Sequence, residues 1–289
     1  MPELPEVETI ARALNQEAAG RTILSVEVID PTALQPSPEA FQALVLGRRI
    51  ASVGRRGKLL LLHLDDGGAD AGLIAVHLRM TGRVFVLAPD QEAIRPRAVL
   101  QLSAHGDEKG PRLAFSDVRR FGSMHAFTPG AIASWPFYQT LGPEPLTMTA
   151  ADFRERTAPS GKANRARIKA LLLDQTVLAG VGNIYADEAL FRAGIRPDTP
   201  AGLIAPAQLD ALFAAIQAVL TQAIAENGSS IRDYRDAHGD AGSFQNHFQA
   251  YKRGGKPCLT CGATMQAMRV AGRTSTFCPR CQPAPAPRR

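Results

Sequence analysis

Cysteine is absent from the first 257 residues of this 289-residue chain, and all four cysteines lie beyond that point. Disulfides therefore cannot hold the body of the protein together, and its stability must come from hydrophobic cores. A chain of this length is sufficient for two domains of ordinary size. Hydrophobic residues make up 45% and charged residues 21%, a composition that excludes a disordered chain.

Long apolar runs are also lacking. No stretch approaches the roughly 18–20 consecutive apolar residues that a membrane-spanning helix requires. The first six residues, Met-Pro-Glu-Leu-Pro-Glu, are acidic and do not have the basic start of a signal peptide. We therefore expect a cytoplasmic protein that has no membrane partner.

Acidic residues are missing from the last part of the chain. From Lys252 to Arg289 there are eight basic residues and no acidic one, whereas the whole chain carries a net charge of +6. The remaining body is thus slightly negative. Such a basic end can simply aid solubility, but it can also bind a polyanion such as a nucleic acid.

The four cysteines of this basic end form two pairs with the spacing C-x-x-C. Sixteen residues separate Cys261 of the first pair, Cys258 and Cys261, from Cys278 of the second pair, Cys278 and Cys281. This spacing is typical of a four-thiolate zinc site in a hairpin ribbon. Two disulfides are the alternative, which the missing secretory signal disfavours. Four protein ligands leave no open position on zinc, so we expect a structural metal.

The pattern of apolar residues changes along the chain from helix to strand and back to helix. Residues 2–19 have apolar positions at helical spacing, followed by Gly20. Short β-type runs then extend to about residue 127, which predicts a sandwich or barrel-like domain. Helical periodicity returns at about 165–174, 184–193 and 207–226. The β-type runs are Thr22–Ile29, Lys58–Leu64, Leu73–Leu78, Arg83–Leu87 and Ala98–Ser103.

These patterns predict an α+β protein with several domains. Residues 2–130 form an N-terminal helix and β-sandwich, and residues 131–150 form a linker. A helix–two-turn–helix domain spans residues 151–240. A zinc ribbon spans residues 245–282, and residues 283–289 form a disordered tail.

A short glycine-containing turn, residues 175–182, joins two of the predicted helices. Asn183 begins the second helix, whose free backbone N–H groups could bind a phosphate oxygen. An asparagine at this place more often only caps the helix. Basic residues in the preceding helix strengthen the interpretation as a phosphate site.

Pro2 is the unusual feature of the N-terminus. Removal of Met1 would leave a proline with a secondary amine, and an α-amino group has a pKa of about 7.7–8.0. Such an amine can attack an aldehyde-level carbon to form an iminium ion. The nearby carboxylates of Glu3, Glu6 and Glu8 can move protons and favour a cationic intermediate. The alternative is that Pro2 and Pro5 only start a helix whose dipole the acidic residues complement.

Segments spread over nearly the whole chain resemble, in the same order, the motifs of the formamidopyrimidine-DNA glycosylase family. The first and last segments are the most specific. The segments are Pro2–Thr9, Arg56–Lys58, His77–Gly82, Arg119–Gly122, Leu141–Pro145, Ala179–Glu188, Gly272–Thr274 and Phe277–Gln282.

The resemblance implies a base-excision repair enzyme that is both a DNA glycosylase and an AP lyase. It implies excision of 8-oxoguanine and formamidopyrimidines from duplex DNA, and cleavage of the abasic site by β,δ-elimination. The damaged nucleotide must be extruded from the duplex. The implied partner is duplex DNA with oxidised purines or abasic sites, and the implied cofactor is one structural Zn²⁺, with no redox or nucleotide cofactor. We expect a bacterial, nucleoid-associated monomer.

The resemblance also implies roles for four catalytic residues. Pro2 would attack C1′ of the damaged nucleotide and displace the base, and Glu3 would act as acid and base. Lys58 would donate a proton in β-elimination, although a phosphate contact is its simpler role. Arg273 would hold the flanking phosphates and assist δ-elimination.

Further residues are implied to contact DNA. Met80, Arg119 and Phe121 resemble the residues that fill the space of the extruded base, with the arginine hydrogen-bonded to the orphaned cytosine. Without the resemblance, Met80 and Phe121 would be taken for core residues. Lys169 and Asn183 would contact phosphates.

The sequence departs from the family pattern at several places. Arg79 and Thr81 stand where the pattern has Gly and Ser, and Lys252 replaces a Gly. Arg97 stands where a DNA-contacting His is expected, and Asn164 where a basic residue is usual. Arg97 and Asn164 are therefore candidate DNA contacts whose chemistry differs from that of the family.

Two alternatives remain open. One is a glycosylase of the endonuclease VIII type, which prefers oxidised pyrimidines and shares Pro2, Glu3 and the zinc ribbon. Leu4 and the Arg119–Phe121 segment favour the purine enzyme. The other alternative is a zinc-ribbon DNA-binding protein without catalytic activity, against which the presence of Pro2, Glu3, Lys58 and Arg273 argues.

Overall fold

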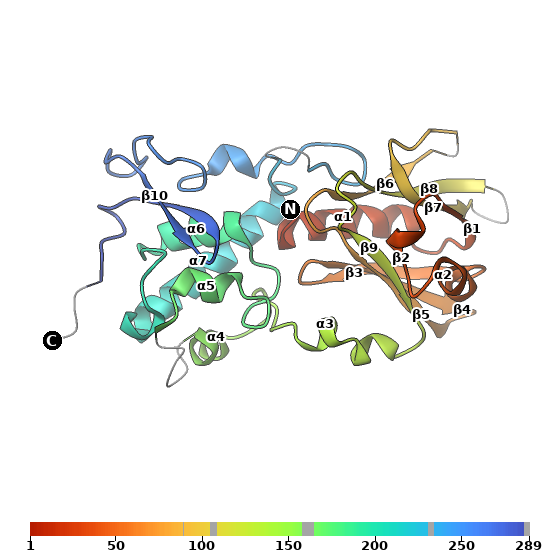
Figure 1. The fold of residues 1–289 in the computed structure, drawn as a ribbon, viewed down its shortest axis with the longest axis horizontal. Coiled ribbons are helices and arrows are strands. Elements are labelled where there is room, and N and C mark those ends of the chain that lie inside the picture. The colour runs from red at the N-terminus through yellow and green to blue at the C-terminus, as the bar shows by residue number, and fades with distance from the viewer. Residues whose placement is uncertain (89, 105–108, 158–164, 231–233, 286–289) are drawn as a thin grey trace. The chain divides into compact units, whose positions relative to one another are not determined.

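The computed structural model describes residues 1–88, 90–104, 109–157, 165–230 and 234–285. The chain forms two compact units. The first contains Met1–Gln139 and Glu226–Gln245, and the second contains Thr140–Ala225 and Asn246–Arg289. Figure 1 shows the elements of both units.

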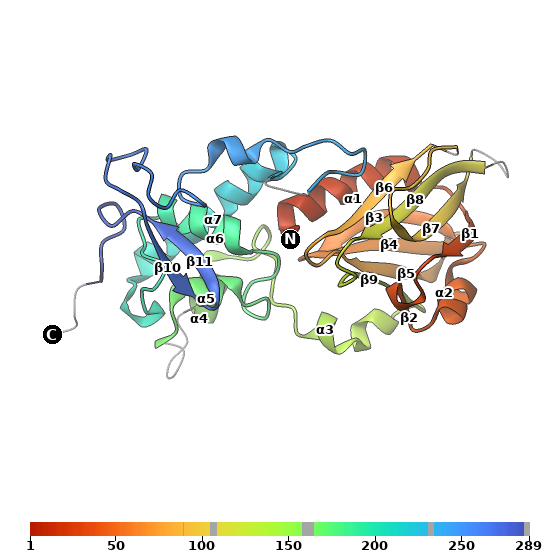
Figure 2. The same ribbon diagram turned by 45° about the horizontal axis from the view of Figure 1, so that its top comes forward.

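The first unit is a β-sandwich with a helix at its start. A five-stranded sheet has the order β2-β9-β5-β4-β3, and a four-stranded sheet has the order β1-β7-β8-β6. All neighbouring strands are antiparallel except β2 and β9. Figure 2 shows the strands of both sheets with α1 beside them. The elements are α1 (Leu4–Ala18), β1 (Ile23–Val28), β2 (Leu34–Gln35), α2 (Pro38–Val45), β3 (Arg49–Arg56), β4 (Leu59–Asp66), β5 (Ala69–His77), β6 (Gly82–Leu87), β7 (Pro96–Ser103), β8 (Lys109–Asp117), β9 (Ser123–Phe127), the 3₁₀ turn η2 (Ala131–Ser134) and α3 (Pro136–Gln139).

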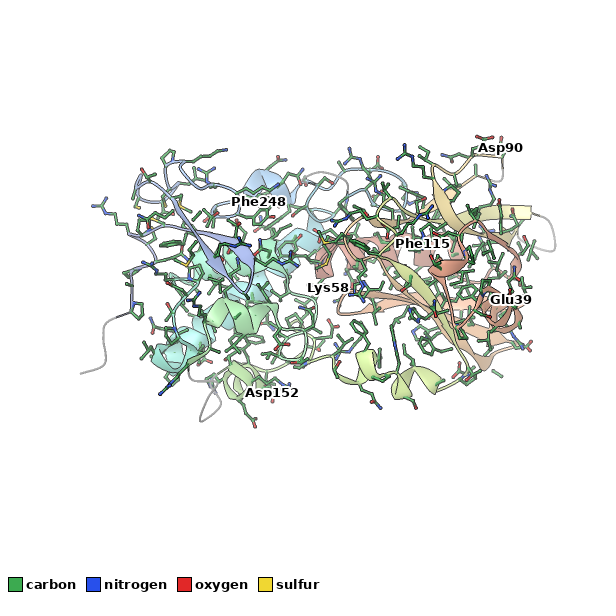
Figure 3. The ribbon with its side chains drawn as sticks, viewed as in Figure 1. Glu39, Lys58, Asp90, Phe115, Asp152 and Phe248 are labelled. Carbon is green, nitrogen blue, oxygen red and sulfur yellow. The ribbon has the colours of Figure 1, made fainter. Side chains whose placement is uncertain are left out.

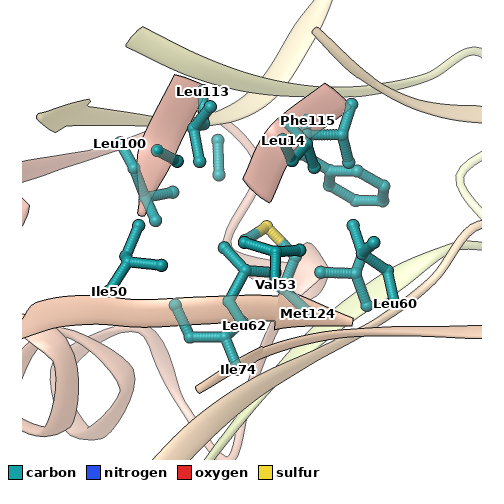
Figure 4. Close-up of a cluster of buried hydrophobic side chains, with 14 of the residues drawn as sticks. Leu14, Ile50, Val53, Leu60, Leu62, Ile74, Leu100, Leu113, Phe115 and Met124 are labelled. Carbon is teal, nitrogen blue, oxygen red and sulfur yellow. The ribbon is translucent and has the colours of Figure 1, made fainter. Parts of the chain in front are cut away.

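Alternate residues of the strands supply the core of this unit, together with the apolar face of α1 (Figure 4). Leu60 and Leu62 of β4 and Leu100 of β7 are 0–2% exposed, as is Leu14 of α1. Each fully buried side chain of this size contributes roughly 1.5–3 kcal/mol through the apolar surface removed from water. The sandwich is therefore a rigid support for the loops at the ends of its strands.

Two contacts fix α1 antiparallel to β3. The Asn15 Oδ1 atom accepts a hydrogen bond of 2.7 Å from the Val53 N–H group, and Glu8 forms an ion pair of 2.7 Å with Arg55. Because α1 and β3 run in opposite directions, the start of α1 lies beside the end of β3. The N-terminus of the chain and the β3–β4 turn therefore lie at the same end of this pair. This turn contains Lys58.

The second unit is helical and carries a two-stranded ribbon. Helix α7 packs against α4 and α6, and β11 packs against α6. The elements are α4 (Ala150–Thr157), α5 (Ile168–Leu173), α6 (Asn183–Arg192), the 3₁₀ turn η4 (Ala201–Leu203), α7 (Pro206–Ala225), β10 (Gln266–Val270) and β11 (Arg273–Phe277).

Helix α7 bears on the expectation that no segment of the chain spans a membrane. Among the described residues it is a helix of 20 residues that is long and apolar enough, by length and composition, to cross a membrane. Half of this stretch is buried inside the protein. A core helix has the same properties, and the packing of α7 against α4 and α6 is of that kind.

The segment that follows α7 returns to the first unit. Residues Glu226–Gln245 group with the sandwich, whereas the expected helical domain extended to residue 240. The physical reason is a pair of contacts with α1. The Glu6 Oε1 atom accepts a hydrogen bond of 2.7 Å from the Ser229 N–H group, and the Tyr234 hydroxyl lies 3.4 Å from the Glu6 carbonyl oxygen.

The expected linker, residues 131–150, is also more ordered than its composition indicates. Trp135 lies against the rings of His125 and Phe127, with centroid distances of 4.8 and 5.3 Å, so the start of this stretch packs on β9. The Gly142 N–H group donates to the Gln175 carbonyl oxygen at 2.7 Å. The stretch thus divides between the two units. Of the expected tail, residues 286–289 lie outside the described residues.

Candidate functional site

Pro2 and Glu3 are buried at the start of α1. Glu3 caps the helix: its side chain accepts the Glu6 N–H group, and the Glu6 carboxylate accepts the Glu3 N–H group at 2.8 Å. The other oxygen of Glu6 accepts the Ser229 N–H group. Glu6 is 2% exposed and ties the N-terminal residues to segment 226–245. The two carboxylate oxygens of Glu6 thus hold the backbone next to Pro2 against segment 226–245.

Gly228 makes this close approach possible. A Cβ atom at this position would lie 2.9 Å from Glu6 Oε1, and its backbone φ of +78° is in the left-handed region. A larger residue would displace either the Glu6 carboxylate or the loop. The sequence indicated Glu6 only as one of the carboxylates near Pro2. Its contact with the loop of Gly228 and Ser229 was not predicted, because it joins residues more than 200 positions apart.

Lys58 lies in the turn between β3 and β4, where Figure 3 labels it. It is 8% exposed, so little water surrounds its ammonium group. Its charge acts on His77 at the end of β5. Burial is the largest cause that lowers the pKa of His77 to about 3, and the charges of Arg79 and Lys58 add to it. His77 is therefore neutral at physiological pH, and its Nδ1 atom accepts a hydrogen bond of 3.0 Å from the Arg79 N–H group.

The residues expected to replace the extruded base lie in two loops of the first unit. Met80 is half-buried in the β5–β6 loop, and Arg119 is exposed in the β8–β9 loop. Phe121 of the same loop is 55% exposed, and the Arg119 guanidinium lies 4.7 Å from its ring centroid. Phe121 is therefore not a core residue. Both loops start or end beside Asp117, because Gly82 of β6 pairs with this residue of β8.

Arg97 is not available to DNA in this structure, which corrects its expected role. It is 3% exposed, and its guanidinium donates to the Gly122 carbonyl oxygen at 2.7 Å and to the Thr32 hydroxyl at 2.8 Å. It also pairs with Asp30 at 3.1 Å. These contacts use the guanidinium to hold the β8–β9 loop from inside the protein.

Lys169 is likewise buried, contrary to the expected phosphate contact. It is 0% exposed, and its ammonium group lies 2.5 Å from Asp187 Oδ1 and 2.6 Å from Ser275 Oγ. The second oxygen of Asp187 accepts the Thr276 N–H group at 3.1 Å. Burial raises the pKa of Asp187 to about 6, against the opposing effect of Lys169. This network joins α5 and α6 to strand β11.

Arg273 is the first residue of β11 and is exposed, next to the turn residue Gly272, whose φ is +72°. Asn183 is the first residue of α6; Gly182 is its N-cap, so Asn183 does not cap the helix as its position suggested. Its side-chain amide donates to the Thr274 carbonyl oxygen at 3.1 Å. The helix start and the residue after Arg273 are thus directly joined. Asn164 lies outside the described residues.

The four cysteine sulfurs form one cluster. All four Sγ atoms lie within 4.8 Å of one another, with 3.9 Å between Cys258 and Cys281 and 3.5 Å between Cys261 and Cys278. Thiolates around a tetrahedral Zn²⁺ ion at about 2.3 Å are separated by similar distances, about 3.8 Å. All four ligand positions belong to the protein, so the ribbon fits a structural zinc ion.

The structure divides the predicted catalytic residues between the two units. Pro2, Glu3 and Lys58 belong to the sandwich unit, and Arg273 belongs to the helical unit with the zinc ribbon. A buried proline beside buried carboxylates, two exposed loops and a basic ribbon with four clustered cysteines are together the features of a DNA-repair glycosylase that carries a zinc ribbon.

Comparison with known proteins assigns the family. Three family descriptions match in order: the formamidopyrimidine-DNA glycosylase N-terminal domain over residues 1–124, the formamidopyrimidine-DNA glycosylase H2TH domain over 141–235, and the zinc finger found in FPG and IleRS over 255–284. The chain belongs to the formamidopyrimidine-DNA glycosylase family.

Relatives and solved structures agree with this assignment. Formamidopyrimidine-DNA glycosylase of Chloroflexus aurantiacus is 46% identical, and that of Nitratidesulfovibrio vulgaris is 43% identical; the match covers 98% of this chain in each case, and 98% and 100% of the relative. Lactococcus lactis FPG in complex with abasic-site DNA is 33% identical with a TM-score of 0.86, covering 97% of this chain and 99% of that one. The same enzyme bound to DNA with an oxidised pyrimidine gives 32% and 0.85, over 98% and 100%.

Proposed function

We propose that this protein excises oxidised purines, such as 8-oxoguanine and formamidopyrimidines, from duplex DNA and then cleaves the resulting abasic site. The observation that carries the proposal is the placement of Pro2, as second residue of the chain, beside Glu3 and at the same end of the sandwich as the Lys58 turn. The solved complexes of Lactococcus lactis FPG with Fapy-dG DNA and abasic-site DNA support the substrate class.

The chemistry starts with Pro2 once Met1 has been removed. The secondary amine attacks C1′ of the extruded nucleotide; the new N–C1′ bond forms as the bond to the base breaks, and the base leaves with a proton. Glu3 moves protons as the sugar ring opens and the iminium forms. Burial of both residues excludes bulk water from this step.

Strand scission follows from the iminium, which acts as an electron sink. Loss of a proton from C2′ expels the 3′ phosphate in β-elimination, for which Lys58 is the proposed proton donor. Arg273, exposed at the start of β11, is proposed to hold the flanking phosphates through two hydrogen bonds and to assist expulsion of the 5′ phosphate. Zinc would hold the ribbon strands together and take no part in the reaction.

Other residues bind DNA or position those that do. Met80, Arg119 and Phe121 fill the space of the extruded base, and the helix start at Asn183 contacts a phosphate. Lys169 and Arg97, both buried, position Arg273 and the β8–β9 loop from behind. We further propose that the protein acts as a monomer in the bacterial cytoplasm, associated with the nucleoid.

Borohydride trapping tests the proposal. The enzyme incubated with duplex DNA containing 8-oxoguanine and sodium borohydride should form a covalent adduct through Pro2, identified by peptide mass analysis. A DNA-binding protein without activity would give none. Lactococcus lactis FPG has also been solved in complex with DNA that contains an oxidised pyrimidine, so excision of such a pyrimidine must be measured beside that of 8-oxoguanine. Faster single-turnover excision of an oxidised pyrimidine than of 8-oxoguanine would replace the proposed substrate class.

A further inference from the structure

The carboxylate of Asp117 contacts both loops that are proposed to replace the extruded base. Its Oδ1 atom accepts a hydrogen bond of 2.5 Å from the Thr81 hydroxyl and one of 3.1 Å from the Arg119 N–H group. Its Oδ2 atom accepts the Gly122 N–H group at 2.6 Å. Asp117 is 3% exposed, so these bonds are made out of water. One side chain thus ties the residue after Met80 to both ends of the Arg119–Phe121 segment.

The β8–β9 loop is held from its other side as well. The Gly122 carbonyl oxygen accepts the Arg97 guanidinium, so this residue is bound at both its N–H and its C=O group. A Cβ atom at Gly122 would lie 2.9 Å from the His77 carbonyl oxygen and 3.1 Å from Asp117 Oδ2. The loop therefore cannot shift at this end without breaking buried contacts.

The backbone of both loops is strained between these fixed points. Arg79 has a φ of 53° and Arg120 a φ of 57°, and each lies beside a residue proposed to enter the duplex. Residues other than glycine persist in the left-handed region only where surrounding contacts determine the conformation. Here the contacts of Asp117 and Arg97 do so, while Arg119 and Phe121 remain exposed.

We propose that Asp117 is a positioning residue that couples the Met80 loop to the Arg119–Phe121 loop, so that filling the vacated space and reading the opposite base occur as one event. This inference rests on the proposed function of those two loops. A carboxylate fits these contacts because it presents two acceptor oxygens. An asparagine side chain keeps one acceptor oxygen and places its amide donor against the N–H group of either Arg119 or Gly122. In this proposal Asp117 acts through the two loops and not by contact with the substrate.

The test compares Asp117→Asn with Ser116→Ala, a matched control one residue earlier on β8. Ser116 is also buried, but its hydroxyl donates to the Ile94 carbonyl oxygen and to neither loop. The measurement is single-turnover excision of 8-oxoguanine opposite cytosine and opposite adenine. Asp117→Asn should reduce the cytosine-to-adenine ratio by about tenfold or more, the effect of losing hydrogen bonds to a charged group. Ser116→Ala should keep the wild-type ratio. Both variants should keep the zinc content and the thermal transition of the wild type.

Thr81 variants isolate the coupling even if Asp117→Asn folds poorly. Thr81→Val removes the hydroxyl at constant shape and should lower the ratio, whereas Thr81→Ser should restore it. In the double variant Asp117→Asn with Thr81→Val, the losses should be less than multiplicative, because the two residues share one contact. A wild-type ratio in both Asp117→Asn and Thr81→Val, with the ratio lost in Arg119→Ala, overturns the coupling alone. A wild-type ratio in Arg119→Ala overturns the proposed role of that loop and the coupling with it.

Discussion

The ammonium group of Lys169 and the carboxylate of Asp187 form an ion pair of 2.5 Å in which the side chains are 0% and 1% exposed. The hydroxyl of Ser275 completes the surroundings of the ammonium. The pair joins helices α5 and α6 to strand β11, and its partner Ser275 is two residues from Arg273 in that strand. Lys169, for which the resemblance implies a contact with DNA, is therefore paired with Asp187 inside the protein.

This placement predicts a loss of stability on breaking the pair. Asp187→Asn leaves the buried ammonium of Lys169 without its counter-charge, which should cost roughly 3–5 kcal/mol in the free energy of unfolding of this unit. Lys169→Met should cost less. Burial raises the pKa of Asp187 to about 6 even though Lys169 lowers it, so without Lys169 the pKa rises further and the carboxyl can take up a proton. Denaturant unfolding of the second unit measures both. Normal stability of Lys169→Met together with weakened DNA binding would instead indicate direct contact with phosphate.

The nucleophile is tested at Pro2. Pro2→Gly keeps an α-amine but makes it primary, so excision should slow on the order of 100-fold or more, while binding of lesion DNA changes only a few-fold. Intact-mass measurement must first show that Met1 is removed from both proteins, since the small second residue allows this in each. Wild-type excision and trapping in Pro2→Gly would exclude Pro2 as the nucleophile.

Zinc removal should separate the two units functionally. Binding of zinc to ribbons of this kind supplies roughly 10–16 kcal/mol of apparent free energy, so Cys278→Ser should unfold β10 and β11 and abolish DNA binding. The sandwich has its own core and should keep its thermal transition. Added zinc should restore binding to chelator-treated wild type but not to the variant. Active protein without zinc would contradict the assignment.

Acid should destabilise the sandwich through His77. Its folded pKa of about 3 lies below the ordinary 6.5, so the unfolded chain binds the proton first and stability falls as the pH drops below about 6.5. By pH 5 the loss amounts to about 2 kcal/mol. His77→Asn, which keeps an acceptor for the Arg79 N–H group, should remove this part of the pH dependence. His63→Asn, at an exposed position of β4, serves as the control in hydrogen exchange at pH 7 and pH 5. If the stability of His77→Asn falls between pH 7 and pH 5 as much as that of the wild type, His77 is not the cause of the pH dependence.

Periodicity in the sequence predicts the first helix and several strands because their buried faces are regular. Four strands of the sandwich were missed. One of them, β2, has only two residues, and the other three were missed for local reasons. The pairing of β3 with β4 shifts between Ile50 and Ser52, which disrupts alternation, and β8 contains Gly110 and Pro111, which usually interrupt strands. The third, β9, has only five residues. Helix α2 was missed as well.

The site could be predicted where chemistry alone identifies a residue, and the cysteine cluster is the clearest case, because its spacing specifies four ligands. The supporting contacts could not. Glu6 and Ser229 lie 223 positions apart, and Asp117 reaches Thr81 across 36. Each depends on how the strands and loops fold together rather than on a local pattern. For the same reason Arg97 and Lys169 were expected on the surface, where the sequence allows them, and lie inside.

Arg273 and Arg119 should fail in different ways, because they are proposed to bind different parts of DNA. Arg273 is exposed on the basic ribbon, where a guanidinium can hold a phosphate with two hydrogen bonds. Arg273→Ala should weaken binding to all DNA and reduce the salt dependence of the affinity, since one phosphate contact is lost. Arg273→Lys keeps the charge but not the planar donor pair, so it should restore binding only in part.

Arg119 is exposed beside Phe121 in the β8–β9 loop, where its proposed partner is the base opposite the lesion. Arg119→Ala should mainly reduce the preference for cytosine over adenine, by about tenfold, the discrimination of one good base contact. Cleavage of pre-formed abasic sites should continue, since Pro2 and Lys58 are untouched. Both variants are to be measured at two salt concentrations and opposite each base. If Arg119→Ala keeps the full cytosine preference while Arg273→Ala binds normally, the two assignments are wrong, because each arginine would then lack the contact that its position predicts.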